Sequence, residues 1–289
     1  MARKLADITG ALLSDKWKVT ATDLGIPIAL TTGELLLIFG DTFAGTKVGS
    51  SDWRSPVGLV GRGNINEPIK FTHAAGGDPN YARQFWKYTH DASPWRNGGF
   101  STVLPTDVIR IGSDLYLHVM VSRGLGNVLW TEIWRSRDQG ASWQHTGNLS
   151  KLDGNAHNGR AKIWAWDYDP TDDYVYVASC GWRDSGIILR RVRPASIADW
   201  RAYENWGWDG KTWKWGNSTA TTITPADEKY GEITLRRLPT GKWIIGGFLA
   251  SKYNISYRVV DSPIANMYET PLQTPVVGAQ WGFEDHANG

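Results

Sequence analysis

The stretch Ser136-Arg137-Asp138-Gln139-Gly140-Ala141-Ser142-Trp143 decides the fold class of this chain. It matches the Asp-box pattern S-x-D-x-G-x-x-W at every defined position. In this motif the aspartate accepts hydrogen bonds from backbone amides inside a hairpin turn, the glycine takes a positive φ, and the tryptophan packs under the turn. Asp-boxes occur mostly in β-propellers. We therefore expect an all-β propeller in which Asp138 is structural and lies outside the active site.

On both sides of this motif the chain has the pattern of successive hairpins. Short runs rich in Val, Ile, Leu, Trp and Tyr alternate with Gly, Asp, Asn and Pro turns, which is typical of β-strands. Four hairpins stand out, with turns near residues 32, 113, 171 and 240. Units spaced this widely suit propeller blades of about four strands better than a sandwich. One short helix is expected over residues 194–203, with Pro194 and Ser196 as start signals.

Length and composition favour one globular domain that binds carbohydrate. The 289 residues can bury a full core, and no linker divides them, so we expect a single domain over residues 1–289. With 31 Lys and Arg against 29 Asp and Glu, nothing favours a nucleic acid partner. The 17 Trp suit stacking on sugar rings, or they fill the space between sheets, and composition leaves both open.

Several common functional signals are missing from the sequence. The start of the chain lacks the apolar segment of a signal peptide, and no run approaches the roughly 18 apolar residues of a membrane helix. We therefore expect a soluble chain without membrane insertion. The histidines lack metal-ligand spacing, so we expect no metal and no cofactor. The single cysteine, Cys180, lies in an apolar run and is expected to be a buried, reduced thiol.

The first hairpin carries two aspartates that could perform chemistry. If Thr31-Thr32-Gly33 is a three-residue loop, then Leu30 opposes Glu34, and the numbers of paired residues sum to about 64. Asp23 then faces Asp41, with Cβ atoms about 4.5–5.5 Å apart. Retaining glycosidases hold their two carboxyl groups about 5–5.5 Å apart. Two carboxylates this close also raise the pKa of one of them, which suits an acid/base residue.

An alternative explanation of this hairpin remains open. A two-residue loop would shift the register by one residue, and Pro27 could introduce a bulge into the first strand. Asp23 would then cap a turn, and Asp41 would end a strand in an ordinary Gly-Asp turn. The spacing by itself does not separate this structural role from the catalytic one.

Two side chains from later blades could join the pair. Glu232 begins a strand in the run Lys229–Leu235 and could point into the central channel as an acid or a pKa-modulating group, or it could be a solvated strand-edge residue. His118 alternates with Tyr116 and Met120 on one strand face, so it is either channel-facing or a hydrogen-bonded core residue.

These segments resemble the five-bladed β-propeller endo-D-arabinanases of actinobacteria and their phages, a family first catalogued as a domain of unknown function. The matching segments are collinear over nearly the whole chain: Thr22-Asp23-Leu24-Gly25-Ile26-Pro27, Phe39-Gly40-Asp41-Thr42-Phe43, Trp53-Arg54-Ser55, Pro105-Thr106, Tyr116-Leu117-His118, the Asp-box, Ala202-Tyr203-Glu204-Asn205-Trp206 and Gly231-Glu232. The first two segments are the most specific.

The resemblance implies endo-hydrolysis of α-linked D-arabinofuranose chains, as in the arabinogalactan and lipoarabinomannan of mycobacterial-type envelopes. It implies that Asp23 and Asp41 are the catalytic carboxylates, with Glu232 in the same site and a retaining outcome. Which aspartate is the nucleophile stays open. The substrate-binding candidates are Trp53, Arg54, His118 and Arg123.

The sequence also departs from the family pattern near its C-terminal end. Family members usually continue past residues 280–282, whereas this chain ends at residue 289, so the last blade is expected to be incomplete. The lack of a signal peptide fits a phage-borne protein that acts on the cell envelope, outside the cell, beside other phage tail proteins. Two other functions are considered: a non-catalytic sugar-binding propeller, such as a lectin or tail adhesin, and a sialidase, for which no arginine triad can be identified.

Overall fold

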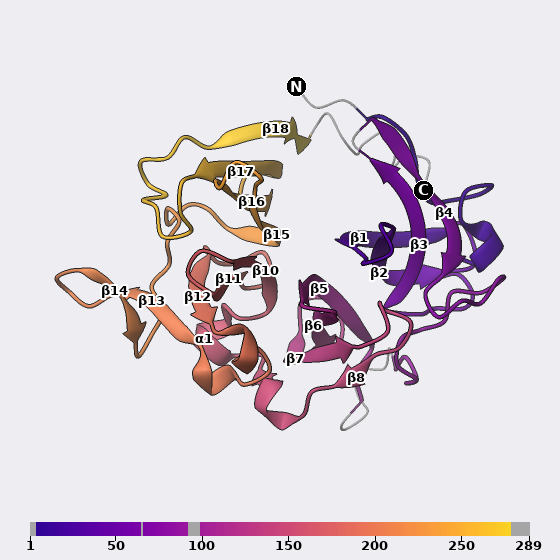
Figure 1. The fold of residues 1–289 in the computed structure, drawn as a ribbon, viewed down its shortest axis with the longest axis horizontal. Coiled ribbons are helices and arrows are strands. Elements are labelled where there is room, and N and C mark those ends of the chain that lie inside the picture. The colour runs from indigo at the N-terminus through magenta and orange to yellow at the C-terminus, as the bar shows by residue number, and fades with distance from the viewer. Residues whose placement is uncertain (1–3, 65, 92–98, 279–289) are drawn as a thin grey trace. The chain divides into compact units, whose positions relative to one another are not determined.

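The computed structural model describes residues 4–64, 66–91 and 99–278, which form four antiparallel β-sheets of blade type (Figure 1). These residues group into two compact units, residues 4–146 and residues 147–278, each of which holds two of the sheets. The prediction of an all-β chain with propeller blades is confirmed. A single domain over residues 1–289 stays a prediction.

The first unit holds two sheets whose strands follow one another in sequence order (Figure 1). A short 3-10 turn, η1 (Asp15–Trp17), precedes them. The strands of the first sheet are β1 (Ala21–Ala29), β2 (Leu35–Phe43), β3 (Val57–Asn64) and β4 (Glu67–Ala74). The consecutive strands of the second sheet are β5 (Thr102–Ile111), β6 (Asp114–Ser122), β7 (Val128–Ser136) and β8 (Gln144–His145).

The two sheets of the first unit share one apolar core. Leu36 and Ile38 of β2 pack in one cluster with Leu115 and Leu117 of β6 and with Trp134 of β7, and all five are almost completely buried. Successive strand side chains point to opposite faces, so alternate apolar residues of each inner strand reach the same core. Burial of this apolar area is the main favourable contribution to folding of the unit.

The second unit also holds two sheets, one of five strands and one of four. One sheet contains β10 (Ile163–Asp169), β11 (Tyr174–Cys180), β12 (Ile188–Val192), β13 (Glu204–Trp208) and β14 (Trp213–Asn217). The other contains β15 (Tyr230–Arg237), β16 (Trp243–Leu249), β17 (Asn254–Val260) and β18 (Gln273–Val277). The short elements are η2 (Asn148–Ser150), β9 (Leu152–Asp153), α1 (Ala156–Gly159), η3 (Pro194–Ser196) and η4 (Trp200–Ala202).

The four predicted hairpins are the first two strands of the four sheets, in the pairs β1–β2, β5–β6, β10–β11 and β15–β16. The prediction of five blades is wrong, because the described residues form four. The expected incomplete last blade concerned the end of the chain. The last described sheet has four strands, and residues 279–289 lie outside the described part. The helix expected over residues 194–203 consists of the separate turns η3 and η4.

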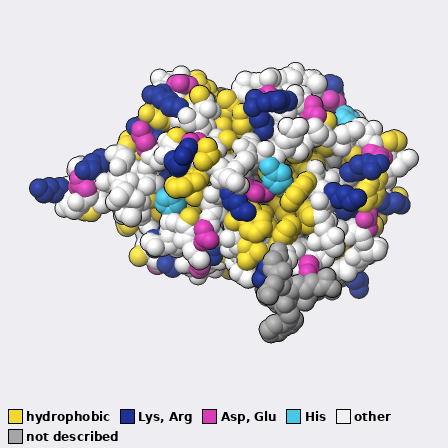
Figure 2. Space-filling model, turned by 90° about the horizontal axis from the view of Figure 1, so that it is seen from below, with side chains coloured by type: hydrophobic (Ala, Val, Ile, Leu, Met, Phe, Trp, Pro, Cys, Tyr) yellow, Lys and Arg dark blue, Asp and Glu magenta, His cyan; other side chains and the backbone are white. Residues whose placement is uncertain are grey.

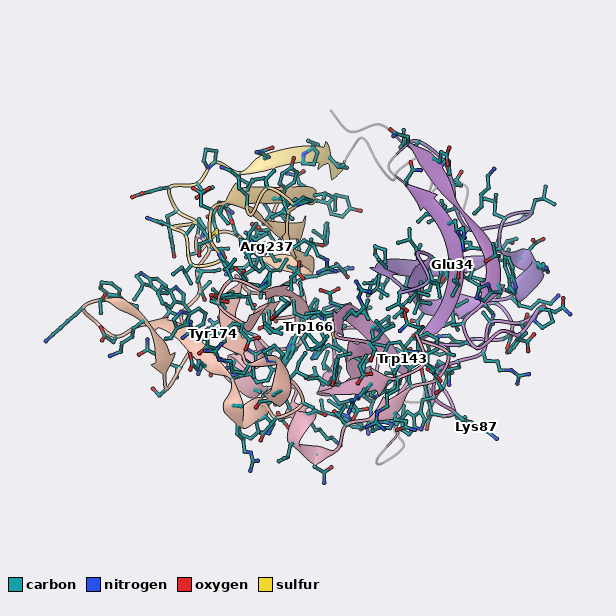
Figure 3. All side chains as sticks on the ribbon, in the orientation of Figure 1. Glu34, Lys87, Trp143, Trp166, Tyr174 and Arg237 are labelled. Carbon is teal, nitrogen blue, oxygen red and sulfur yellow. The ribbon has the colours of Figure 1, made fainter. Side chains whose placement is uncertain are left out.

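The Asp-box has the predicted structure. Asp138 accepts hydrogen bonds from the Ser142 backbone amide at 2.9 Å and from the Ser142 hydroxyl at 2.6 Å. Gly140 has φ +88°, and the buried Trp143, labelled in Figure 3, donates from Nε1 to the Gly140 carbonyl at 3.2 Å. The Trp143 ring also stacks on Phe85 with centroids 5.4 Å apart. This turn therefore fixes the connection between β7 and β8.

Candidate active site

The β1–β2 hairpin has the predicted loop and nearly the predicted register. Gly33 takes φ +79°, and the Leu30 amide donates to the Glu34 carbonyl at 2.8 Å, with Glu34 labelled in Figure 3. Thr22 pairs with Thr42 at one end of the ladder, and Pro27 pairs with Leu37 further along, so both pairs sum to 64. The bulge that the alternative explanation allowed at Pro27 is absent, because the ladder is regular there.

The ladder is instead irregular next to Asp23. The register shifts on both sides of Leu24, which pairs with Phe39, and both Leu24 and Gly25 have positive φ values of +67° and +85°. Such bulges re-aim side chains and are common beside active sites. Here the bulge removes Asp23 from the paired positions, and the Asp23 oxygen Oδ1 lies against Gly40, where it would collide with a Cβ atom. Asp23 is thus directed at the residue that precedes Asp41.

The Asp41 carboxylate is held by two donors from other parts of the first unit. Trp53 donates from Nε1 to Asp41 Oδ1 at 2.7 Å, and the Thr102 hydroxyl donates to the same oxygen at 2.6 Å. Asp41 is half-buried, and Thr102 is buried. Charged acceptors form the stronger class of hydrogen bonds. Both bonds therefore fix the orientation of the carboxylate at the end of β2.

The backbone pairing of Arg54 places Trp53 next to Asp41. The backbones of Arg54 and Thr42 exchange two hydrogen bonds of 2.9 Å each, which places Trp53 beside the end of β2. The Arg54 side chain is only 4% exposed, and it donates to the carbonyls of Ala82 at 2.5 Å and Asp52 at 3.1 Å. These contacts make Arg54 an anchor of the loop. Its predicted substrate contact remains a prediction.

His118 and Arg123, the other substrate-binding candidates of the first unit, lie on or just after β6. His118 is completely buried, and the Thr106 hydroxyl lies 2.6 Å from its Nδ1 atom. This placement matches the core alternative considered for His118. Arg123 is half-buried and donates from Nε to the Gly99 carbonyl at 2.6 Å.

Glu232 belongs to the second unit, on β15. It is half-buried and accepts a hydrogen bond from Arg183 Nη2 at 2.7 Å in an ion pair. The Arg183 guanidinium also lies over the Phe248 ring, 5.1 Å from its centroid. The preceding residue must be small, because a Cβ on Gly231 would meet Arg183 Cγ at 2.9 Å. Arg183 therefore sets the position and the charge environment of Glu232.

The sequence did not identify Thr102 or His90 as part of the environment of Asp41. Thr102 lies 61 residues after Asp41 along the chain. His90 stacks on Trp53 with ring centroids 4.2 Å apart. No local pattern marks either residue, because both contacts form only when β5 and residues 84–90 pack against the first sheet.

A metal site, a membrane-spanning helix, a reactive thiol and a basic patch have less support in the described part of the chain. No group of three or more His, Cys, Asp or Glu side chains is placed there to hold a metal ion. No described helix is long and apolar enough to cross a membrane. Cys180 is buried as a free thiol, with Sγ 3.3 Å from the Gly231 carbonyl oxygen. On the face shown in Figure 2, Lys and Arg are interspersed with Asp and Glu rather than gathered in one basic patch.

Comparison of the sequence with protein families gives one match over most of the chain. The model of a domain of unknown function, DUF4185, matches residues 11–282. Notoamide biosynthesis cluster protein J' of Aspergillus versicolor is 30% identical over 276 residues, which is 91% of this chain and 74% of that protein. An uncharacterised 35.9 kDa protein of Mycolicibacterium smegmatis is 28% identical over 256 residues, or 86% of this chain and 71% of that protein.

Comparison of the structure gives solved structures that share the fold. A candidate hydrolase from Bacteroides ovatus has a TM-score of 0.58 at 12% identity, covering 92% of this chain and 72% of that one. The GH43_1 enzyme from Xanthomonas citri has a TM-score of 0.51 at 12% identity, covering 89% and 74%. At this identity the likeness shows the fold alone, an all-β propeller.

Proposed function

We propose that this chain, which belongs to the DUF4185 family, is an endo-acting glycoside hydrolase that cleaves α-linked D-arabinofuranosyl chains with Asp23 and Asp41. The likeness of its fold to propeller glycoside hydrolases supports the reaction class. The resemblance of the segments around Asp23 and Asp41 to endo-D-arabinanases supports the substrate. A relative in Mycolicibacterium smegmatis is in keeping with mycobacterial-type arabinan as the target.

The observation that carries the proposal is the way in which the first hairpin presents its two carboxylates. Asp41 is held through one oxygen, since both of its hydrogen bonds within the described part of the chain reach Oδ1. Its other oxygen, Oδ2, is the one we assign to attack. The exposed Asp23 is turned by the bulge toward Gly40, next to Asp41. A fixed carboxylate beside an exposed one suits a nucleophile and an acid/base residue, respectively.

In the proposed reaction Asp41 Oδ2 attacks the anomeric carbon while Asp23 gives its proton to the glycosidic oxygen. The carbon–oxygen bond to the leaving chain breaks, and an ester to Asp41 forms. Asp23, now a carboxylate, takes a proton from water, whose oxygen attacks the same carbon and releases Asp41. Two inversions give net retention of configuration. Glu232 is proposed as a further catalytic carboxylate, on the strength of the resemblance.

The test is release of oligosaccharides from purified D-arabinan by the wild type and by Asp23→Asn and Asp41→Asn. Both variants should lose at least about 10³-fold in kcat, since removal of a covalent nucleophile or its acid/base partner removes most of the chemical step. Asp7→Asn is the matched control, because Asp7 is exposed and forms an ion pair with the exposed Lys4. It should keep full activity.

The same assay separates the enzyme from the sugar-binding alternative. Tight binding of D-arabinan by the wild type without any release would exclude hydrolysis and leave a lectin or tail adhesin. Full activity in Asp23→Asn or Asp41→Asn would refute the assignment of that residue. The anomeric configuration of the first products, read by NMR before mutarotation, tests retention. We also propose action outside the cell on the envelope, among phage tail proteins, for which electron microscopy of virions with a labelled chain is the test.

A further inference from the structure

The Trp53 indole, which donates to Asp41, stacks on two other rings. Phe43 stacks on it with centroids 6.0 Å apart and planes 25° apart. His90 stacks on it with centroids 4.2 Å apart and planes 27° apart. Stacking on two rings restricts rotation of the indole about its side-chain torsions. The direction of the Nε1–H bond to Asp41 therefore depends on the position of the His90 ring.

Both ring nitrogens of His90 face oxygen acceptors. Nδ1 lies 2.8 Å from the Ser101 carbonyl oxygen, and Nε2 lies 2.8 Å from Gln84 Oε1. The orientation of the Gln84 amide is fixed, because its Oε1 accepts from the Ser55 amide at 3.0 Å and its Nε2 donates to the Trp86 carbonyl at 2.8 Å. A neutral imidazole has one N–H group and can make only one of the two bonds, whereas an imidazolium makes both.

These contacts connect His90 to both donors of Asp41. One donor, Trp53, lies against the face of the His90 ring. The other donor, Thr102, directly follows Ser101, whose carbonyl is bound by the His90 ring edge. Ser101 is itself buried, and its amide donates to the Ser122 carbonyl at 2.7 Å. A displacement of His90 would therefore move the two groups that orient the carboxylate.

We propose that His90 is a positioning residue for Asp41, and that it holds Trp53 by stacking and the Ser101–Thr102 backbone by a hydrogen bond through Nδ1. The role in catalysis rests on the proposed function of Asp41. The role in structure does not, because it concerns only the orientation of the Trp53 and Thr102 donors.

The charge of His90 should influence this arrangement. Burial lowers the pKa of the His90 imidazole from its ordinary 6.5, while the Ser101 carbonyl and the negative charge of Asp41 act in the opposite direction. The ionisable groups that face it are Asp41 on β2 and the Tyr88 phenol on its own segment, whose ring centroid lies 4.7 Å away. Burial raises the Tyr88 pKa, so this phenol remains neutral. As pH rises through the lowered His90 pKa, one of the two hydrogen bonds is lost.

The experiment follows the Trp53 indole N–H resonance by NMR as a function of pH, with the resonance assigned from its loss in Trp53→Phe. In the wild type this resonance should shift with a midpoint below 6.5 that matches the titration of the His90 ring. In His90→Phe, which keeps an aromatic ring of similar size, that transition should disappear. His73→Phe is the matched control. His73 lies on β4, where its Nδ1 is 2.9 Å from the Thr72 hydroxyl. This variant should leave the transition unchanged.

The kinetic arm uses D-arabinan and the same variants. His90→Ala should lower kcat on the order of 10²-fold, as expected when a reacting group is misplaced by about 1 Å. His90→Phe should lower it less, and KM should change little in either variant. An indole resonance that is the same in wild type and His90→Phe at every pH would overturn the proposal. Because the NMR arm requires no turnover, a wild type inactive on arabinan would refute the proposed function and leave the positioning test intact.

Discussion

Across the first hairpin, the Asp23 carboxylate oxygen Oδ1 occupies the space that a Cβ on residue 40 would need, so Gly40 and Asp23 fit only because Gly40 has no side chain. The same Cβ would meet Leu24 Cδ1 at 2.8 Å and Leu104 Cδ2 at 3.3 Å. Gly40 thus permits the close approach of Asp23 to the end of β2. This contact links the bulge in β1 to the position of Asp41.

Gly40→Ala should therefore displace Asp23 and reduce both activity and stability. We expect a loss of about 1–3 kcal/mol in the free energy of unfolding from overpacking, and a fall in kcat on the order of 10²-fold from misplacement of the carboxylate. Urea unfolding and the arabinan assay measure the two effects. Gly33→Ala is the control: Gly33 has φ +79° and open space around it, so it should cost about 1 kcal/mol at full activity. Equal kinetic losses in both variants would contradict this explanation.

Removing the donors of Asp41 should impair catalysis. Thr102→Val keeps the side-chain shape but removes the 2.6 Å hydrogen bond, and Trp53→Phe removes the 2.7 Å bond. We expect each to lower kcat about 10-fold, since a hydrogen bond to a charged group contributes about 1.5–3 kcal/mol. The double variant should show a non-additive loss, because both donors act on one oxygen. If kcat were unchanged in both single variants and in the double variant, Asp41 would be oriented by other contacts.

The Asp-box should make stability depend on acid pH. Partial burial raises the pKa of Asp138, but the hydrogen bonds from Ser142 and Ser136 outweigh this effect, so the pKa lies below its ordinary 3.8. A carboxyl with a lowered folded-state pKa stabilises the fold above the unfolded-state pKa, and this stabilisation is lost as pH falls through the folded-state value. The difference in the free energy of unfolding between wild type and Asp138→Asn should therefore become smaller below about pH 4. Urea unfolding from pH 3 to 7 measures it, and a constant difference would contradict the prediction.

The second unit contains a buried ion pair whose removal should be costly. Arg258 donates from Nη1 and Nη2 to the two oxygens of Glu228 at 2.9 and 2.7 Å, and both residues are buried. The Tyr230 hydroxyl adds a third hydrogen bond at 2.7 Å. Arg258→Met leaves Glu228 buried without its cation, so the free energy of unfolding should fall by about 3–5 kcal/mol.

The matched comparison for this pair is Arg258→Met combined with Glu228→Leu, which removes both charges. It should recover part of the lost stability, because replacement of both partners leaves no buried charge. Lys242→Met, which breaks an exposed pair with Asp261, should change stability by at most about 1 kcal/mol. If Arg258→Met lowered the free energy of unfolding no more than Lys242→Met, the Arg258–Glu228 pair would not be stabilising.

Much of the fold could be predicted because it depends on local sequence. The four hairpins and the Asp-box turn are each encoded within one short run of neighbouring residues, by strand periodicity and by turn residues such as Gly33 and Gly140. The five-blade prediction was wrong because it was taken from the resemblance, whereas the sequence itself contains four such hairpins. The irregularity of the first strand lies at Leu24 and Gly25, where positive φ values break the ladder, and not at Pro27, where the alternative explanation would have put a bulge.

The sequence by itself determined the hairpin that carries Asp23 and Asp41, since pairing across a three-residue loop follows from turn chemistry and the period of a strand. Only the tertiary structure decided what surrounds Asp41, because its donors Trp53 and Thr102 lie 12 and 61 residues away along the chain. Such contacts form when separate strands and loops pack together. Their specificity comes from the geometry of the packed core, which no local pattern of residues encodes.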